Sequence, residues 1–228
     1  MQINFKHKIS AVIAAAGKSS RMGLPNGISK QFIEVNGKTV IEKTIAAFDS
    51  CGYIDEIIVA ARPEDIGKIW EIIKKSKIRK IKDIISGGAT RRESVANAAA
   101  LVSNHMEYIA IHDGARCFIS HEDIKKTALK AFETGAAAAG AKITDTVKYA
   151  GNGGRIIRTL DRDNLWAVYT PQIFEKNLYM SAIKNFTGDV TDDCAVVEKA
   201  GHPVYIVECS RYNIKITETE DLEYAGRI

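Results

Sequence analysis

Small and basic residues gather in one short segment near the start of the chain, directly after an apolar run at residues 9–14. The segment reads Ala14-Ala15-Ala16-Gly17-Lys18-Ser19-Ser20-Arg21-Met22-Gly23. Small residues let the backbone approach a ligand closely, and successive amides can then point at phosphate oxygens. The segment therefore suits phosphate binding, although a glycine turn beside a solvated Arg21 would have the same composition.

This segment matches neither of the two commonest phosphate-binding loops. A Walker loop that ends in Gly17-Lys18-Ser19 would need glycine where Val12 stands, and the dinucleotide fingerprint G-x-G-x-x-G is absent from the sequence. A nicotinamide-dependent oxidoreductase is therefore not favoured. Phosphate binding and a plain turn remain equally compatible with the segment taken alone.

Other segments that could do chemistry are Lys30-Gln31-Phe32, Gly87-Gly88-Ala89-Thr90-Arg91-Arg92-Glu93-Ser94-Val95 and His112-Asp113-Gly114-Ala115-Arg116. Each lies where a strand is expected to finish, so we expect all of them at the same edge of one sheet, where ligands bind in α/β folds. Asp113 could hold a divalent metal together with phosphate oxygens, or accept from ribose hydroxyls. Alternatively, Asp113 is an ordinary turn residue that precedes glycine.

The elements that must position these residues are short apolar runs alternating with segments of helical period. This pattern predicts an α/β fold with a doubly wound, mostly parallel, Rossmann-like sheet and helices on both faces. We expect strands at 9–14, 56–61, 81–85, 108–112, 136–142 and 204–208, and helices at 39–49, 64–76, 91–102, 121–134 and 192–200. Capping boxes at Thr90–Glu93 and Thr217–Glu220 predict two helix starts.

Residues 144–171 break this alternation, because two β-type runs flank Gly151-Asn152-Gly153-Gly154. They predict a β-hairpin arm that projects from the sheet. No linker, repeat or low-complexity segment is visible elsewhere, so we expect a single domain over residues 1–228 with this arm.

Composition excludes several classes of protein. The chain has 228 residues, of which 46% are hydrophobic, and its net charge is +4. It has no apolar run of about 18 residues and no apolar block at its start, so we expect a cytoplasmic protein with no membrane partner. The four cysteines show no zinc or disulfide spacing. The basic stretch at 74–82 has no interleaved aromatic residues, so a nucleic-acid partner is not expected.

Nine motifs follow one another in the order of a known family and together span nearly the whole chain. They are Ala15-Ala16-Gly17-Lys18-Ser19-Ser20-Arg21-Met22-Gly23, Lys30-Gln31, Gly87-Gly88 with Ser94-Val95, Asp113-Gly114-Ala115-Arg116, Asp145-Thr146-Val147-Lys148, Leu165-Trp166, Thr170-Pro171-Gln172, Thr191-Asp192-Asp193 and Asn213-Ile214-Lys215-Ile216-Thr217. With these motifs the chain resembles the 2-C-methyl-D-erythritol 4-phosphate cytidylyltransferases of the non-mevalonate isoprenoid pathway. Three positions depart from the usual pattern: Ala14 and Cys117 replace prolines, and Tyr169 stands where more polar residues are usual.

The resemblance implies that CTP and the sugar-alcohol phosphate 2-C-methyl-D-erythritol 4-phosphate react, with Mg²⁺ as cofactor, to give 4-diphosphocytidyl-2-C-methyl-D-erythritol and pyrophosphate. Its catalytic set would be Arg21, Lys30, Arg162 and Lys215. Arg21 and Lys30 would neutralise charge on the α-phosphate and the departing pyrophosphate. The cytidine pocket would comprise Ala15, Ala16, Gly17, Gly88, Ala89, Ser94, Asp113 and Gly114. Arg162 and Lys215 would hold the sugar phosphate with Arg116, Thr146, Thr170 and Thr191. Asp113 is also the candidate metal ligand.

The attacking group in this reaction is a phosphate monoester that is already anionic, so no histidine base is required. Positioning and fixed positive charge should carry most of the rate. A ribitol 5-phosphate cytidylyltransferase is the nearest alternative, although such proteins typically carry Ala-Gly-Gly where Ala15-Ala16-Gly17 stands. A non-catalytic nucleotide- or anion-binding module is the alternative from another class. The arm predicts a homodimer, with an arm folded back on its own sheet as the alternative. The resemblance implies that Thr146 and Arg162 on this arm reach the sugar-phosphate site of the other subunit.

Overall fold

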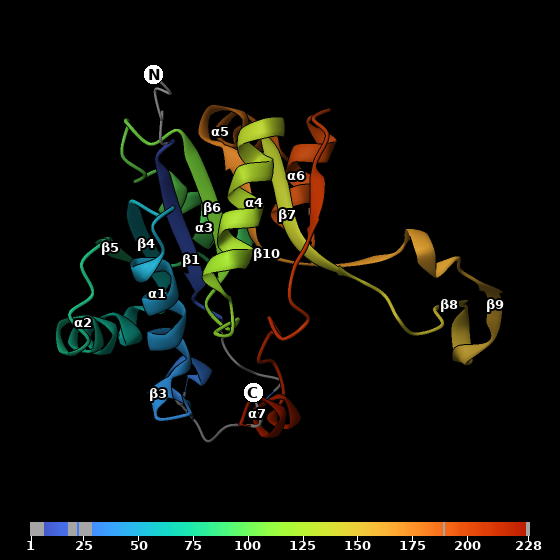
Figure 1. Cartoon of the computed structure of the whole chain (residues 1–228), viewed down its shortest axis with the longest axis horizontal. Helices are drawn as coiled ribbons and strands as arrows, with labels where there is room; N and C mark the ends of the chain where they lie inside the picture. The colour runs from blue at the N-terminus through green and yellow to red at the C-terminus, as the bar shows by residue number, and fades with distance from the viewer. Residues whose placement is uncertain (1–6, 18–21, 23–28, 189, 227–228) are drawn as a thin grey trace.

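The computed structural model describes residues 7–17, 22, 29–188 and 190–226, and a seven-stranded sheet forms its centre (Figure 1). The strand order is β11-β7-β10-β6-β1-β4-β5. The strands are β1 (Ile9–Ala15), β4 (Glu56–Ala61), β5 (Ile81–Ser86), β6 (Tyr108–Asp113), β7 (Ala136–Lys142), β10 (Trp166–Glu175) and β11 (Tyr205–Glu208). Only β10 runs antiparallel to its neighbours in this sheet. The predicted mostly parallel α/β fold is confirmed.

Helices cover both faces of the sheet, which explains why its central strands are continuously apolar. Residues of α1 (Val40–Ser50), α2 (Ile66–Lys75) and α4 (His121–Thr134) pack in the core on one face. Residues of α3 (Arg91–Ala99), α5 (Lys176–Asn185) and α6 (Asp193–Lys199) pack on the other. The five predicted helices form with ends shifted by at most three residues, whereas α5 was not predicted.

Close packing in the sheet requires glycine at one position of β7. The strand is almost entirely alanine, and it lies between β10 and β11. A Cβ atom at Gly140 would lie 2.8 Å from Cγ2 of Ile206 and 3.0 Å from the carbonyl oxygen of Ala167. Since the second of these atoms belongs to the backbone, only glycine fits at this position.

Of the two predicted capping boxes, one begins at the predicted residue and the other begins one residue later. At the start of α3, Thr90 accepts from the backbone N–H of Glu93 as predicted, while the Glu93 carboxylate accepts from the N–H of Ala89. Helix α7 (Thr219–Ala225) begins at an N-cap formed by Glu218, whose capping box includes Asp221. The predicted box that began at Thr217 was therefore wrong by one residue, because the Glu218 carboxylate takes the N3 amide.

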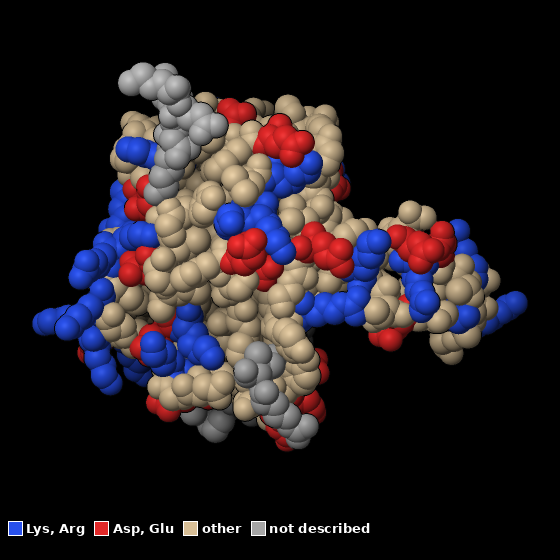
Figure 2. Space-filling model, viewed as in Figure 1, with Lys and Arg blue, Asp and Glu red and all other residues tan. Residues whose placement is uncertain are grey.

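The predicted arm exists, but it ends earlier than expected. It carries the hairpin of β8 (Lys148–Ala150) and β9 (Ile156–Thr159), which projects from the body of the protein (Figures 1 and 2). Residues 166–171 were assigned to the arm, yet they run within β10 of the central sheet. The physical reason is the pairing of Trp166–Val168 with residues 140–142 of β7, which draws this part of the chain back into the core sheet.

The basic stretch at 74–82 lies on the surface. It spans the end of α2 and the start of β5, where Figure 2 shows Lys and Arg side chains gathered on the left.

The remaining features of the chain are its cysteines, a second sheet and the length of its helices. All four cysteines are buried and free, and burial raises the pKa of Cys117 to about 11. A second, small sheet pairs β2 (Glu34–Val35) with β3 (Lys38–Thr39). Within the described ranges, no helix is both long and apolar enough to cross a bilayer.

A buried carboxylate links neighbouring segments at the edge of the sheet where the parallel strands begin. Glu56, at the start of β4, is 7% exposed and accepts hydrogen bonds from the Ser10 hydroxyl at 2.9 Å and from both the backbone and the hydroxyl of Ser103. Burial alone would raise its pKa. The hydrogen bonds from Ser103 and Ser10, with the charge of Lys82, outweigh burial and lower the pKa below its ordinary value of 4.5.

Glu56→Gln should therefore destabilise the protein at neutral pH. It should also make the free energy of unfolding fall less steeply as the pH is lowered into the acid range. Because the folded pKa is lowered, the ionised carboxylate stabilises the fold above its unfolded pKa, and that contribution is lost as the pH falls through the lower folded pKa. Hydrogen bonds to a charged acceptor predict a loss of about 2 kcal/mol at pH 7. Urea unfolding at pH 7 and pH 4 measures this.

Glu64→Gln is the matched control, because the Glu64 side chain is 62% exposed and its ion pair with Arg62 is a long 3.4 Å. It should change the free energy of unfolding little at either pH. If the free energy of unfolding changed between pH 7 and pH 4 by the same amount in Glu56→Gln as in the wild type, the role given to the Glu56 charge would be contradicted.

Candidate active site

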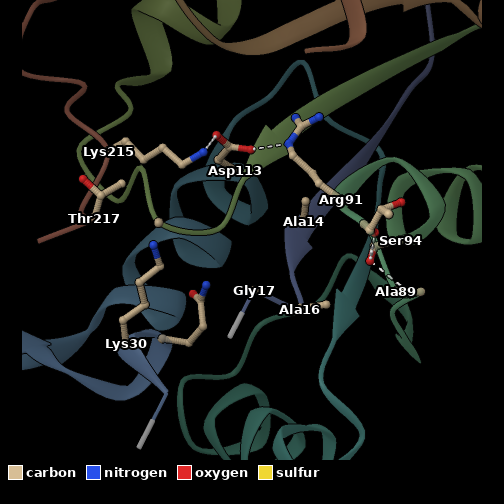
Figure 3. A pocket seen from close by; sticks show the side chains of 14 residues that line it. Ala14, Ala16, Gly17, Lys30, Ala89, Arg91, Ser94, Asp113, Lys215 and Thr217 are labelled. Carbon is tan, nitrogen blue, oxygen red and sulfur yellow. Dashed lines mark hydrogen bonds and ion pairs between the residues drawn. The ribbon is translucent and has the colours of Figure 1, made fainter. Parts of the chain in front are cut away.

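A cavity of about 550 Å³ opens at the carboxyl ends of β1, β5 and β6, where the sequence placed the ligand site (Figure 3). This volume is in the range of small-molecule sites. Segments that follow these three strands supply most of its wall, together with residues 30–31 and residues near the C-terminus. The lining residues are Ala14, Ala16, Gly17, Lys30, Gln31, Gly88, Ala89, Thr90, Arg91, Ser94, Asp113, Ala115, Lys215 and Thr217.

The loop after β1 touches the glycine pair after β5. A Cβ atom at Gly87 would lie 2.4 Å from Cβ of Ala16 and 2.7 Å from Oγ of Ser94, so glycine permits this approach. Ser94 secures the second loop, because its hydroxyl donates to the carbonyl of Thr90 at 2.9 Å and accepts from the N–H of Gly88 at 3.0 Å. These contacts bring two backbone segments to one wall of the pocket.

Asp113, the last residue of β6, is the central anion of the site (Figure 3). Nζ of Lys215 lies 2.6 Å from its Oδ2, and Nε of Arg91 lies 2.9 Å from its Oδ1. Burial would raise the pKa of this carboxyl, but the charges of Arg91 and Lys215 outweigh burial and hold the pKa well below its usual range. Asp113 is therefore ionised at every physiological pH.

Arg91 joins the pocket to a helix on the same face of the sheet. Its Nη1 lies 2.6 Å from Oδ2 of Asp193, and Oδ1 of Asp193 accepts from the Tyr179 hydroxyl at 2.7 Å. The side-chain oxygen of Gln172 accepts from the backbone N–H groups of Asp193 and Cys194, both at 3.0 Å. The start of α3 is thereby fixed to the start of α6.

Tyr179→Phe tests this connection. The variant keeps the ring, which stacks on Phe174, and removes the hydroxyl that donates to Asp193. The free energy of unfolding should fall by about 1.5 kcal/mol, because a buried charged acceptor loses a donor. Urea unfolding measures the change, and Tyr212→Phe, at a 58% exposed tyrosine, is the control that should show none.

Lys30 reaches the pocket from a short 3-10 helix, η2 (Lys30–Phe32). Ser29 caps this helix by accepting from the N–H of Gln31, and Nζ of Lys30 donates to the carbonyl of Ile216 at 2.8 Å. Lys30, Arg91 and Lys215 therefore bring three cations from distant parts of the sequence to one cavity. Such an arrangement can bind a polyanion such as a triphosphate.

The structure gathers about half of the predicted site residues. Those that line the pocket are Ala16, Gly17, Lys30, Gly88, Ala89, Ser94, Asp113 and Lys215. Ala15 is 1% exposed in the core, and Gly114 follows Asp113 directly; neither lines the pocket. Arg21 lies outside the described residues.

The remaining predicted residues lie beside the pocket or far from it. Thr170 accepts from the N–H of Asp113 at 3.0 Å, and Nε of Arg116 lies 3.9 Å from Oδ2 of Asp113, so both lie next to the pocket wall. Thr191 is exposed just before α6. Thr146 and Arg162 are exposed in the arm segment and are not part of this pocket within their own subunit.

Sequence reasoning gave no site role to several residues that line the cavity. The most consequential is Arg91, which looked like part of a capping box although it follows the glycine pair of a predicted ligand loop. A basic residue close behind a glycine pair in a ligand loop is the sequence signal that could have identified Arg91 as a site residue. Gln31 stood in a quoted motif without a role, and Ala14, Thr90, Ala115 and Thr217 also line the pocket.

His112 is packed in the core beside the pocket. It is fully buried, with Nδ1 3.1 Å from the Thr170 hydroxyl and Nε2 3.1 Å from the carbonyl oxygen of Arg116. Burial lowers its pKa to about 4, so it is neutral near pH 7. It holds the end of β6 in place and bears no charge.

The fit of a metal ion can be judged from the carboxylates. The described residues contain no group of three or more His, Cys, Asp or Glu side chains that could hold a metal. Among the residues that the structure describes, Asp113 is the only carboxylate that lines the pocket, and both of its oxygens contact cations. The geometry therefore does not favour Asp113 as a direct ligand of a resident Mg²⁺ ion.

Comparisons with known proteins agree with one another. The model of a protein family described as 2-C-methyl-D-erythritol 4-phosphate cytidylyltransferase matches residues 9–228. A relative of that name from Clostridium tetani is 40% identical over 221 residues, which cover 96% of this chain and 89% of the relative. One from Caldanaerobacter subterraneus is 40% identical over 223 residues, covering 95% of this chain and 96% of the relative. The crystal structure of a 4-diphosphocytidyl-2C-methyl-D-erythritol synthase from Anaerococcus prevotii superposes with a TM-score of 0.87 at 31% identity, covering 97% of this chain and 96% of that one.

Proposed function

The chain belongs to the 2-C-methyl-D-erythritol 4-phosphate cytidylyltransferase family, and from this premise we propose that it transfers the cytidylyl group of CTP to 2-C-methyl-D-erythritol 4-phosphate in isoprenoid precursor biosynthesis. The products are 4-diphosphocytidyl-2-C-methyl-D-erythritol and pyrophosphate. The observation that carries the proposal is one cavity at the carboxyl edge of the sheet that Lys30, Arg91, Lys215 and Asp113 all line, with Arg91 and Lys215 paired to Asp113.

The proposed reaction needs positioned charge and no protein base. A phosphate oxygen of the sugar phosphate attacks the α-phosphorus of CTP, a new P–O bond forms, and the bond to the β-phosphate breaks to release pyrophosphate. Lys30 and Arg21 would stabilise the negative charge that builds on the α-phosphate and on the leaving group. The neutral, buried His112 agrees with this division of labour.

The nucleoside end of CTP would lie against the loops after β1 and β5. Ala15, Ala16, Gly17, Gly88, Ala89, Ser94 and Gly114 are the proposed surroundings of cytidine. The ionised Asp113 could accept from ribose hydroxyls, because its charge is maintained by Arg91 and Lys215. Arg116, Thr170, Thr191 and Lys215 would hold the sugar phosphate.

Mg²⁺ is the proposed cofactor, and it would enter with the phosphates of CTP. When bound, it would neutralise triphosphate charge. The cations around Asp113 would hold that carboxylate in place. Loss of activity on chelation by EDTA, restored by added Mg²⁺, is expected.

A homodimer with shared sites is part of the proposal. Tyr149, Ile156 and Ile157 on the arm hairpin are 54%, 60% and 59% exposed, and the hairpin projects away from its own sheet (Figure 1). Large apolar side chains on an isolated hairpin favour burial against another surface. Thr146 and Arg162 would then act in the site of the other subunit. The cytoplasmic location expected from the sequence remains a prediction.

A pyrophosphate-release assay tests the proposed function. Purified protein with CTP and Mg²⁺ is given either 2-C-methyl-D-erythritol 4-phosphate or ribitol 5-phosphate, and UTP replaces CTP in a parallel series. The first sugar phosphate with CTP should turn over far faster than any other combination. Equal or faster turnover with ribitol 5-phosphate would identify the alternative enzyme, and no turnover with either would favour a binding module.

A further inference from the structure

The guanidinium of Arg116 is held on two sides by uncharged groups. Its Nη1 donates to the carbonyl of Asn213 at 2.7 Å, and its central carbon lies 4.8 Å from the centroid of the Tyr169 ring. The Arg116 side chain is 11% exposed. Asn213 is itself fixed, because it is fully buried and donates to the carbonyl of Thr170 at 2.8 Å.

One donor of this guanidinium is left without an acceptor. Nε of Arg116 is buried and makes no hydrogen bond within the described part of the chain. It lies 3.9 Å from Oδ2 of Asp113, close enough for an ion pair but beyond hydrogen-bonding distance. A buried N–H without a hydrogen-bond partner is costly, so this guanidinium keeps unused donor capacity beside the pocket wall.

The Tyr169 ring is the contact that bears on the plane of the Arg116 guanidinium. A guanidinium is planar, and stacking on an aromatic face fixes its plane while leaving its edge donors available. The carbonyl of Asn213 fixes one end but does not by itself fix the plane. Tyr169 was noted in the sequence only as a departure from the family pattern. It stands immediately before Thr170, which contacts both Asp113 and His112.

We propose that Tyr169 is a positioning residue whose ring holds the Arg116 guanidinium in the orientation that binds the phosphate monoester of the second substrate. The inference rests on the proposed function, because that function supplies the phosphate monoester. Tyr169 acts through Arg116 and need not touch the reacting atoms. Its effect should therefore appear in the binding of the sugar phosphate and not in the binding of CTP.

Steady-state kinetics of Tyr169→Leu and Tyr169→Phe test the proposal, with each substrate varied at saturation of the other. Tyr169→Leu should raise the KM for the sugar phosphate by about three- to thirtyfold, the range of a cation–π contact, while the KM for CTP changes less than about twofold. Tyr169→Phe keeps the aromatic face and should stay within about twofold of the wild type. Thermal unfolding confirms that each variant is folded, and Tyr169→Gln replaces the leucine variant if that one is not.

Tyr205→Leu is the matched control. The Tyr205 ring also faces a cation, Nζ of Lys130 at 5.2 Å, but it lies on β11 at the far edge of the sheet. This variant should leave both KM values unchanged. An unchanged KM for the sugar phosphate in folded Tyr169→Leu, or an equal rise in both KM values, would overturn the proposal. A loss in Tyr169→Phe as large as in Tyr169→Leu would also overturn it, since the hydroxyl would then be the acting group.

Failure of this inference differs from failure of the proposed function. A wild type that is active beside an equally active Tyr169→Leu refutes only the role of Tyr169. A wild type that uses ribitol 5-phosphate instead refutes the proposed substrate, and the variants are then compared with ribitol 5-phosphate, which carries the same phosphate monoester. A wild type inactive with both refutes the function and the inference together.

Discussion

Lys30→Ala should lower kcat about 100-fold or more, equivalent to about 2.7 kcal/mol of lost transition-state stabilisation, while the KM for CTP changes far less. Lys30 lines the cavity, and its Nζ is held by the carbonyl of Ile216 at 2.8 Å. A cation fixed in this way need not reorganise when negative charge moves toward the leaving pyrophosphate. Its contribution should therefore be greater in the transition state than in the bound ground state.

The measurement is steady-state pyrophosphate release with both substrates varied. Lys38→Ala is the control, because it removes an exposed lysine on β3 that lies outside the pocket, and its kinetics should match the wild type. Lys30→Arg keeps the charge and should retain more activity than Lys30→Ala. An unchanged kcat with a raised KM for CTP would assign Lys30 to ground-state binding of the nucleotide.

Mixed dimers of two inactive variants should regain activity. If the arm of one subunit completes the site of the other, a Lys30→Ala chain paired with an Arg162→Ala chain has one site with both defects and one site with neither. Activity would then rise from nearly none to as much as half of the wild-type value per heterodimer. Arg162 is exposed on the arm segment, where its Nη1 donates to the carbonyl of Thr144 at 2.6 Å, and it is not part of the pocket of its own subunit.

The two chains carry different affinity tags, and a tandem purification after subunit exchange isolates the heterodimer. Each parent homodimer is assayed beside it. A heterodimer of Lys30→Ala with Lys215→Ala is the control, because both lysines line the same pocket of one chain and no intact site can form. Isolated heterodimers of Lys30→Ala and Arg162→Ala with no more activity than their parents would show that Arg162 does not act across the subunits.

Much of the fold and half of the site could be predicted because they depend on local pattern. The strands β1, β4 and β6 are continuous apolar runs, since both faces of a parallel sheet are covered by helices. Parallel strands also place their carboxyl ends at one edge, so the loops after β1, β5 and β6 had to meet there. Gly17, Gly88 and Asp113 line one cavity for that reason.

The sequence by itself thus determined the fold class and the position of the ligand edge, whereas tertiary structure decided which side chains hold one another there. Strand β10 enters antiparallel between β6 and β7, and nothing local in residues 166–171 distinguishes it from an arm strand. Arg91 contacts Asp113 and Asp193, which is 102 residues away, and Lys215 comes from near the C-terminus to the same carboxylate. Periodicity reports which face of an element is buried, but the partner of a charge depends on where distant segments pack, and only the folded chain contains that information.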